Sequence, residues 1–147
     1  PLFLRREPQI QRLAAALIQA VETYAQTLPP LDPNHPLLSG PRAPVRFSGS
    51  WSVRLSGGGL HVNHVHPEGW ISSAFYVALP PAPDAGSTDG WLTLGEPPKE
   101  LNLGLEPFRL IEPEAGRLAL FPSYTWHGTR PYPDGERLTC AFDVVAG

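Results

Sequence analysis

Several residue types and patterns are scarce in this sequence, and each shortage excludes a class of protein. Cysteine occurs once, at Cys140, so no internal disulfide can form and a reducing, cytoplasmic location is expected. No apolar run reaches the length of a membrane span, and no signal-peptide pattern opens the chain. No basic run accompanies the net charge of −3, which argues against nucleic acid or an anionic membrane surface as a partner.

Methionine is absent even from position 1, so we expect a fragment or a processed form that an upstream part could precede. The 147 residues and the hydrophobic fraction of 41% fit one folded domain with a sizeable core. The 19 prolines and 14 glycines are scattered rather than repeated, which predicts many short segments separated by turns. We therefore expect a single, mainly β domain over residues 1–147.

One amphipathic helix is predicted within residues 1–30. Apolar residues recur there at intervals of three and four between Ile10 and Ala25, which is typical of one helical stripe. Pro8 suits the first helical turn, and the pair at 29–30 would end the helix. We expect the stripe to pack on a sheet of the same domain rather than on a partner protein.

From residue 45 onward the sequence changes to short apolar or alternating segments bounded by glycine and proline. These segments predict seven or eight strands, at 45–55, 60–66, 70–80, 90–95, 108–113, 116–123, 126–132 and 137–145. A set of short strands over residues 45–147 predicts a sandwich, a jelly roll or a small barrel.

Three of the five histidines fall within the stretch HVNHVHPEGW, residues 61–70. Residues i and i+2 of a strand face the same side, so His64 and His66 can converge on one metal ion. His61 has the opposite parity and is expected to point away unless the preceding glycines bulge the strand. His127, in FPSYTWHGTRPY, is the best candidate for a third ligand, and such a set leaves open positions on the metal, as in catalytic sites.

Arg137 opens the apolar strand RLTCAFDVV, ten residues after the distal histidine. A buried arginine needs an anionic partner, and a guanidinium suits a carboxylate well, although an arginine at a strand edge could also face water. Four further side chains are candidates for hydrogen bonds to the ligands or for contact with a substrate: Trp126, Ser123, Arg54 and Asn63. Of these, Trp126 could wall the pocket or fill the core, Asn63 could be a turn or surface residue, and Arg54 could equally lie at a strand edge.

The motifs occur in the order H-x-H, AFYVAL, LFPS, a distal histidine and an arginine ten residues later. In this order the chain resembles the iron(II)- and 2-oxoglutarate-dependent oxygenases. It is most similar, over roughly residues 30–147, to bacterial oxygenase domains often linked to tetratricopeptide repeats. The resemblance implies a double-stranded β-helix, a jelly roll of two sheets with helices supporting one face.

The resemblance also implies Fe(II) as the metal, 2-oxoglutarate as the cosubstrate and O2 as the oxidant. Decarboxylation of 2-oxoglutarate would be coupled to hydroxylation of an unidentified substrate, either a protein side chain or a small molecule. Carried over to this chain, His64 takes the first metal position and His127 the distal one. Arg137 and Tyr76 match residues that contact the far carboxylate of 2-oxoglutarate.

The chain departs from the family pattern at His66, where a carboxylate is usual. Asp84 or Glu68 could supply a carboxylate instead, but we rank His66 first as the ligand. Because related three-histidine dioxygenases use no 2-oxoglutarate, such a dioxygenase remains an alternative, and so does a metal-binding module without catalysis. Arg137 favours the oxygenase, since a mere metal-binding module has no need of a carboxylate clamp.

Overall fold

The computed structural model describes residues 1–147. One α-helix and two 3₁₀ helices accompany eight strands. In chain order the elements are η1 (Leu2–Leu4), α1 (Pro8–Gln26), β1 (Val45–Ser56), β2 (His61–His64), β3 (Ile71–Ala78), β4 (Leu92–Leu94), η2 (Lys99–Leu101), β5 (Arg109–Ile111), β6 (Leu118–Pro122), β7 (His127–Thr129) and β8 (Glu136–Ala146).

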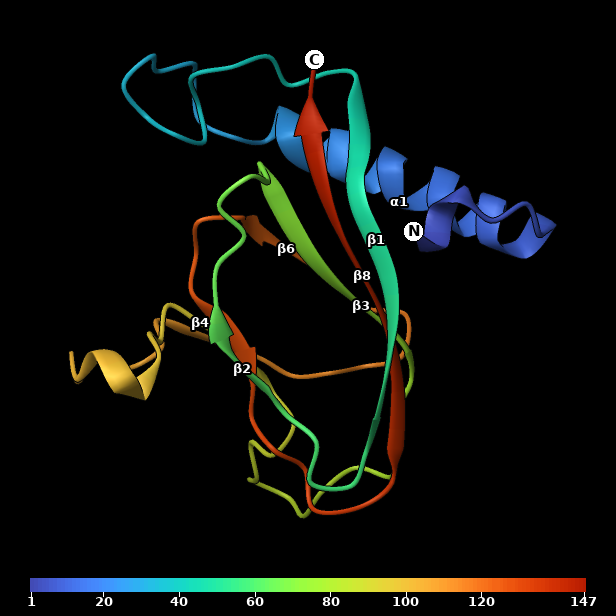
Figure 1. Ribbon diagram of the computed structural model, residues 1–147, viewed down its shortest axis with the longest axis vertical. Helices are drawn as coiled ribbons and strands as arrows, with labels where there is room; N and C mark the ends of the chain where they lie inside the picture. The colour runs from blue at the N-terminus through green and yellow to red at the C-terminus, as the bar shows by residue number, and fades with distance from the viewer.

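The strands form two antiparallel sheets of four strands each. The larger sheet has the order β1-β8-β3-β6 and the smaller one β2-β7-β4-β5 (Figure 1). Most neighbours in each sheet are distant in the sequence, as in jelly rolls, where the chain passes repeatedly between two sheets. The predicted mainly β architecture with seven or eight short strands is confirmed.

Helix α1 supports the larger sheet, as the apolar stripe predicted. Pro8 occupies its first turn, where the missing N–H leaves no hydrogen bond unmade. Thr27 caps its C-terminus, ahead of the two prolines. Figure 1 shows α1 crossing the larger sheet, and its buried residues join those of the strands in one core: Ala14, Leu17, Val21, Ile71, Cys140, Phe142 and Val144.

No helix has the length and apolarity that crossing a membrane requires.

Strand β8 divides this core from a cavity between the sheets. Side chains alternate along a strand, so its even-numbered residues face α1 and its odd-numbered residues face the smaller sheet. Cys140, Phe142 and Val144 belong to the core under the helix. Arg137, Thr139 and Ala141 line the cavity. One strand therefore carries structural residues on one face and candidate functional residues on the other.

Strand β2 is shorter than predicted and irregular. His61 pairs with Thr129, whereas His64 pairs with His127. Three residue steps on β2 thus match two on β7, so β2 carries one extra residue. Such a bulge reverses the alternation of side chains across it. Because of the bulge, the faces of β2 cannot be assigned by counting residues alone.

Candidate metal centre

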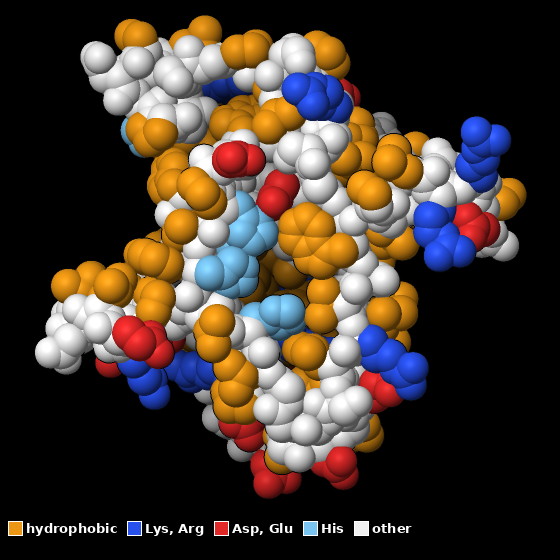
Figure 2. All heavy atoms as spheres, viewed as in Figure 1, with side chains coloured by type: hydrophobic (Ala, Val, Ile, Leu, Met, Phe, Trp, Pro, Cys, Tyr) orange, Lys and Arg blue, Asp and Glu red, His pale blue; other side chains and the backbone are white.

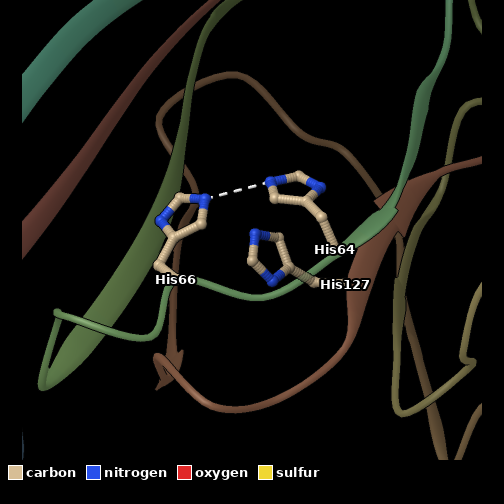
Figure 3. Close-up of side chains that lie close together, drawn as sticks. All are labelled: His64, His66 and His127. Atoms are coloured by element: carbon tan, nitrogen blue, oxygen red, sulfur yellow. Dashed lines mark hydrogen bonds between the residues drawn. The ribbon is translucent and has the colours of Figure 1, made fainter.

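Three histidines from separate segments meet between the two sheets. His64 ends β2, His66 lies in the loop that follows, and His127 begins β7. One nitrogen of each ring lies within 4.8 Å of the others, and Nε2 of His64 and Nε2 of His66 are 3.0 Å apart. Figure 3 shows the three rings turned toward one another, and Figure 2 shows histidine side chains gathered in a hollow of the surface.

The other nitrogen of each ring is held by a hydrogen-bond acceptor. Nδ1 of His64 donates to the carbonyl of Val62 at 2.7 Å, and Nδ1 of His127 to that of Thr125 at 2.9 Å. Nδ1 of His66 donates to Asp143 instead. Each acceptor fixes the tautomer in which Nε2 carries a free lone pair, as metal-binding histidines require.

The donor set fits a divalent metal ion. An imidazole nitrogen lies about 2.1 Å from such an ion, so two nitrogens at right angles on it are about 3 Å apart. The 3.0 Å between His64 and His66 meets this condition. Burial lowers the pKa of His127 to about 4, so its imidazole is neutral and able to bind a metal near pH 7. Three imidazole nitrogens suit Fe(II) and other first-row ions.

The exception allowed for His61 applies, because β2 carries a bulge. His61 lines the same cavity as His64, since the extra residue in β2 brings both to one side. It is not part of the metal cluster. The argument from strand parity also does not apply to His66, which lies beyond the end of β2. Its backbone N–H donates to the carbonyl of Ser123 at 2.9 Å, which holds this residue beside the cluster.

Arg137 and Tyr76 lie in the cavity with the three histidines, as expected. Arg137 is 3% exposed, and its guanidinium donates to the carbonyl of Gly90 at 3.0 Å and to Oγ1 of Thr129 at 3.1 Å. Its Nε has no hydrogen-bond partner, and no carboxylate pairs with it. Burial raises the pKa of Tyr76, although the charge of Arg137 opposes this, so its hydroxyl stays protonated and can donate.

Ser123 lies beside one of the candidate ligands, His66. Its carbonyl accepts from the backbone N–H of His66 at 2.9 Å, and its Oγ bonds Oγ of Ser72 at 2.8 Å. It forms no hydrogen bond with the distal histidine, His127. The nearest acceptor there is the carbonyl of Thr125.

Three further candidates do not line the cavity. Arg54 is largely exposed and pairs with Glu136 at 2.6 Å, so its alternative position at a strand edge is the correct one. Asn63 accepts a hydrogen bond from Thr93 at 3.1 Å, outside the metal cluster. The tryptophan beside the cluster is Trp51, whose ring centre lies 5.9 Å from that of His66; Trp126 is not among the residues that surround the cavity.

Neither carboxylate left open as a ligand joins the cluster. Asp84 lies on an exposed loop and Glu68 on an exposed turn after His66. The carboxylate that does approach a candidate ligand is Asp143, which no motif in the sequence singles out. It is 77 residues from His66, and only the register of β8 against β3 could have indicated that the two residues meet.

A family model matches residues 49–143, which is most of the chain, and is described as "Putative 2OG-Fe(II) oxygenase". The chain belongs to this 2-oxoglutarate- and iron(II)-dependent oxygenase family. Iron(II) and 2-oxoglutarate are the cofactor and cosubstrate that define the family, so the predicted identity of both is confirmed. No protein of curated function matches the sequence.

Solved oxygenase structures share the fold. A prolyl-4-hydroxylase from Pseudomonas putida superposes with a TM-score of 0.62 at 18% identity, covering 97% of this chain and 68% of that one. HygX from Streptomyces hygroscopicus, with nickel and 2-oxoglutarate bound, gives 0.61 at 14% identity, over 95% and 68%. These likenesses confirm the double-stranded β-helix with an N-terminal helix.

A shorter match relates the chain to a larger protein. An oxidoreductase of the 2OG-Fe(II) oxygenase family from Burkholderia pseudomallei gives a TM-score of 0.55 at 17% identity and covers 73% of this chain. The chain spans about half of that protein's length, with a coverage of 48%.

Proposed function

We propose that this protein is an oxygenase that couples decarboxylation of 2-oxoglutarate to hydroxylation of an organic substrate. In this proposal His64, His66 and His127 hold iron(II), and Arg137 with Tyr76 binds the far carboxylate of 2-oxoglutarate. Bound iron would supply activation of dioxygen, with succinate and carbon dioxide formed from the cosubstrate. The protein supplies the geometry and a site screened from water.

The observation that carries the proposal is the unpaired charge of Arg137. Burying an arginine without a counter-ion is costly, yet this guanidinium is almost fully buried and has only neutral acceptors. Its Nε remains without any acceptor. The cavity that it lines also contains the three histidines. A dianion that binds the metal with one end and Arg137 with the other would supply a ligand to the metal and a counter-ion to the arginine.

The residues around Arg137 support a carboxylate as the bound group. Tyr76 is buried in the same cavity and keeps its phenolic proton, so it can donate to a carboxylate oxygen. Burial, then the charge of Arg137, lowers the pKa of His61, so this imidazole is neutral at pH 7 and adds no further positive charge. Arg137 is thus the cationic anchor at this end of the cavity.

Both alternatives explain less of the site. A non-catalytic metal module would not require a buried arginine facing the metal. A three-histidine dioxygenase independent of 2-oxoglutarate would require the arginine only if its own substrate were an anion. We propose a protein side chain or a small molecule as the substrate, and Trp51, partly exposed beside His66, as a residue that could contact it.

A reducing compartment such as the cytoplasm is the proposed location. Iron must stay in the ferrous form for this chemistry, and Cys140 is a free thiol. Free thiols and ferrous iron are both maintained under reducing conditions.

The decisive experiment is a titration of the iron(II) protein with 2-oxoglutarate in the absence of oxygen, followed by its visible spectrum. A saturable charge-transfer band is expected when the keto acid chelates the metal. Arg137→Ala should weaken 2-oxoglutarate binding by roughly 30-fold or more, because a buried charge pair that loses one partner costs about 2 kcal/mol or more. Arg54→Ala, which removes an exposed arginine from the same domain, should not change the affinity.

The outcomes separate the three functions. A band whose affinity falls only in Arg137→Ala supports the oxygenase. One bound iron per chain without any band supports the dioxygenase or the binding module. A band with unchanged affinity in Arg137→Ala would overturn the role assigned to this arginine.

A further inference from the structure

A carboxylate stands behind the histidine that replaces the family's usual carboxylate ligand. Nδ1 of His66 lies 2.8 Å from Oδ1 and 2.7 Å from Oδ2 of Asp143. The other ring nitrogen, Nε2, faces Nε2 of His64 at 3.0 Å. The imidazole of His66 therefore lies between Asp143 and the metal cluster.

The other two histidines are held differently. His64 and His127 both donate to backbone carbonyls, which are neutral acceptors. Only His66 donates to a charged group, and it occupies the one position where a negatively charged ligand is usual. The site thus keeps a carboxylate, displaced outward by the width of one imidazole ring.

Asp143 is itself fixed by a chain of hydrogen bonds through the larger sheet. Ser72 on β3 donates to Oδ1 of Asp143 at 2.6 Å, and the Oγ atoms of Ser72 and Ser123 are 2.8 Å apart. Ser72 lies opposite Asp143 in the pairing of β3 with β8. Both serines are fully or almost fully buried, so these bonds are shielded from water.

Asp143 has no other cationic partner. Its one ion-pair contact is with His66, and no arginine or lysine is paired with it. Its side chain is 14% exposed, so solvent screens its charge only in part. The negative charge of Asp143 can therefore stabilise a cation bound by His66.

We propose that Asp143 is a positioning residue that supplies the negative charge of the metal site through His66. The inference rests on the proposed function, in which His66 is a metal ligand. A carboxylate that accepts a hydrogen bond from Nδ1 fixes the orientation of the ring and makes the lone pair of Nε2 a stronger ligand for a metal. Removing such an outer partner typically weakens metal binding by about 10- to 100-fold.

The test is the affinity of the metal-free protein for cobalt(II) and iron(II), measured without oxygen in competition with a chelator. Asp143→Asn keeps the size of the side chain and an oxygen acceptor but removes the charge. It should weaken the binding of both metals by about 10- to 100-fold. Asp84→Asn makes the same change on an exposed loop and should leave both affinities unchanged. The unfolding temperatures of the metal-free forms show whether each variant folds.

A double-mutant cycle distinguishes a role at the metal from a structural one. His66→Asp places a carboxylate at the usual ligand position, close to Asp143. In that background Asp143→Asn should leave metal affinity unchanged or tighten it, because it removes a like charge beside the new ligand. A purely structural Asp143 would cost the same factor in both backgrounds, which would contradict the proposal.

Failure of this inference can be told apart from failure of the proposed function. If the unaltered protein binds no metal, the proposed function is wrong. If it binds metal and Asp143→Asn binds it equally well, only the role of Asp143 is wrong. If Asp143→Asn does not fold, Ser72→Ala is the deciding variant. It removes a hydrogen bond that holds the Asp143 carboxylate and should weaken metal binding by about 2- to 10-fold. An unchanged metal affinity would overturn the inference.

Discussion

The two sheets differ in how they are built and in what they contribute to the site. The strands of the larger sheet, β1, β8, β3 and β6, have 12, 11, 8 and 5 residues, whereas those of the smaller sheet have 4 or 3. The larger sheet packs under α1 and carries Arg137, Tyr76 and Asp143. The smaller sheet has no helix behind it and carries His64 and His127.

The proposed anion-binding residues and the candidate metal ligands therefore lie on sheets that we expect to differ in stability. Short strands with few buried neighbours open more easily than strands in a core. A metal ion held by His64, His66 and His127 would tie the smaller sheet to the loop that enters the larger one. Binding to the folded state alone adds stability, so the metal should stabilise the smaller sheet most.

The largest expected effect is on the larger sheet. Phe142 is fully buried and packs edge-on against Phe47 with ring centres 5.3 Å apart. Phe142→Ala should lower the free energy of unfolding by about 3–5 kcal/mol, with or without metal. Phe108→Ala, the same change in an exposed side chain beside the smaller sheet, should cost far less. Denaturant unfolding checks both, and equal losses would remove the distinction between the sheets.

The next effect concerns the metal. His127→Ala removes a candidate ligand of the smaller sheet and should weaken metal binding by more than the roughly 100-fold upper range for outer partners. His61→Ala changes a histidine of the same cavity that lies outside the cluster and should keep the metal. Metal content after dialysis gives the result. Retention of metal by His127→Ala would mean that the ion binds elsewhere.

A smaller effect is expected where β2 meets β7. A Cβ on Gly128 would lie 2.1 Å from Oδ1 of Asn63 and 2.8 Å from the carbonyl oxygen of His61, which is backbone and cannot rotate away. Gly128→Ala should therefore lower the free energy of unfolding by about 1–3 kcal/mol. It should also weaken metal binding, because β2 carries His64. Gly40→Ala, where a Cβ meets nothing within 4 Å, is the control.

If Gly128→Ala left both the unfolding temperature and the metal affinity unchanged, β2 would be free to shift without disturbing His64. The smaller sheet would then be more adaptable than its pairing with β7 indicates.

The smallest effect is the pH dependence of the metal-free protein. The pKa of His127 is lowered from 6.5 to about 4 by burial, so the unfolded chain binds a proton there before the folded one does. The stabilisation is present above pH 6.5 and is lost as the pH falls toward 4. Between pH 7 and 5 this should cost on the order of 1–2 kcal/mol.

The control for this prediction is His127→Gln, which does not titrate. Its free energy of unfolding should fall less between pH 7 and 5 than that of the unaltered protein, whatever its absolute value. Equal losses would show that acid acts on other groups.

Local patterns in the sequence were enough to predict most of the scaffold. The stripe from Ile10 to Ala25 and its flanking prolines gave α1, and segments bounded by glycine and proline gave the strands. The convergence of His64, His66 and His127 was also expected, although resemblance to a known family contributed to it. These features depend on neighbours in the chain or on motifs whose spacing is kept.

Features that depend on register could not be predicted. The bulge that turns His61 into the cavity exists only relative to β7. Asp143 meets His66 because β3 and β8 align Ser72 with it. Trp126 is adjacent to His127 in the chain but precedes β7 and does not line the cavity, so nearness in sequence indicated the wrong tryptophan. Trp51 reaches the site from β1 instead.

The hydrogen bonds that hold all three Nδ1 atoms have a consequence for which metal the protein carries. The rings are oriented before any ion arrives, and imidazole nitrogens are not the oxygen ligands that hard ions such as Mg²⁺ prefer. Among first-row ions, however, imidazole sites favour nickel, copper and zinc over iron(II). A ready-made three-imidazole site would therefore be filled according to supply, and the fraction of molecules that can react with oxygen would follow the ratio of available iron to its competitors.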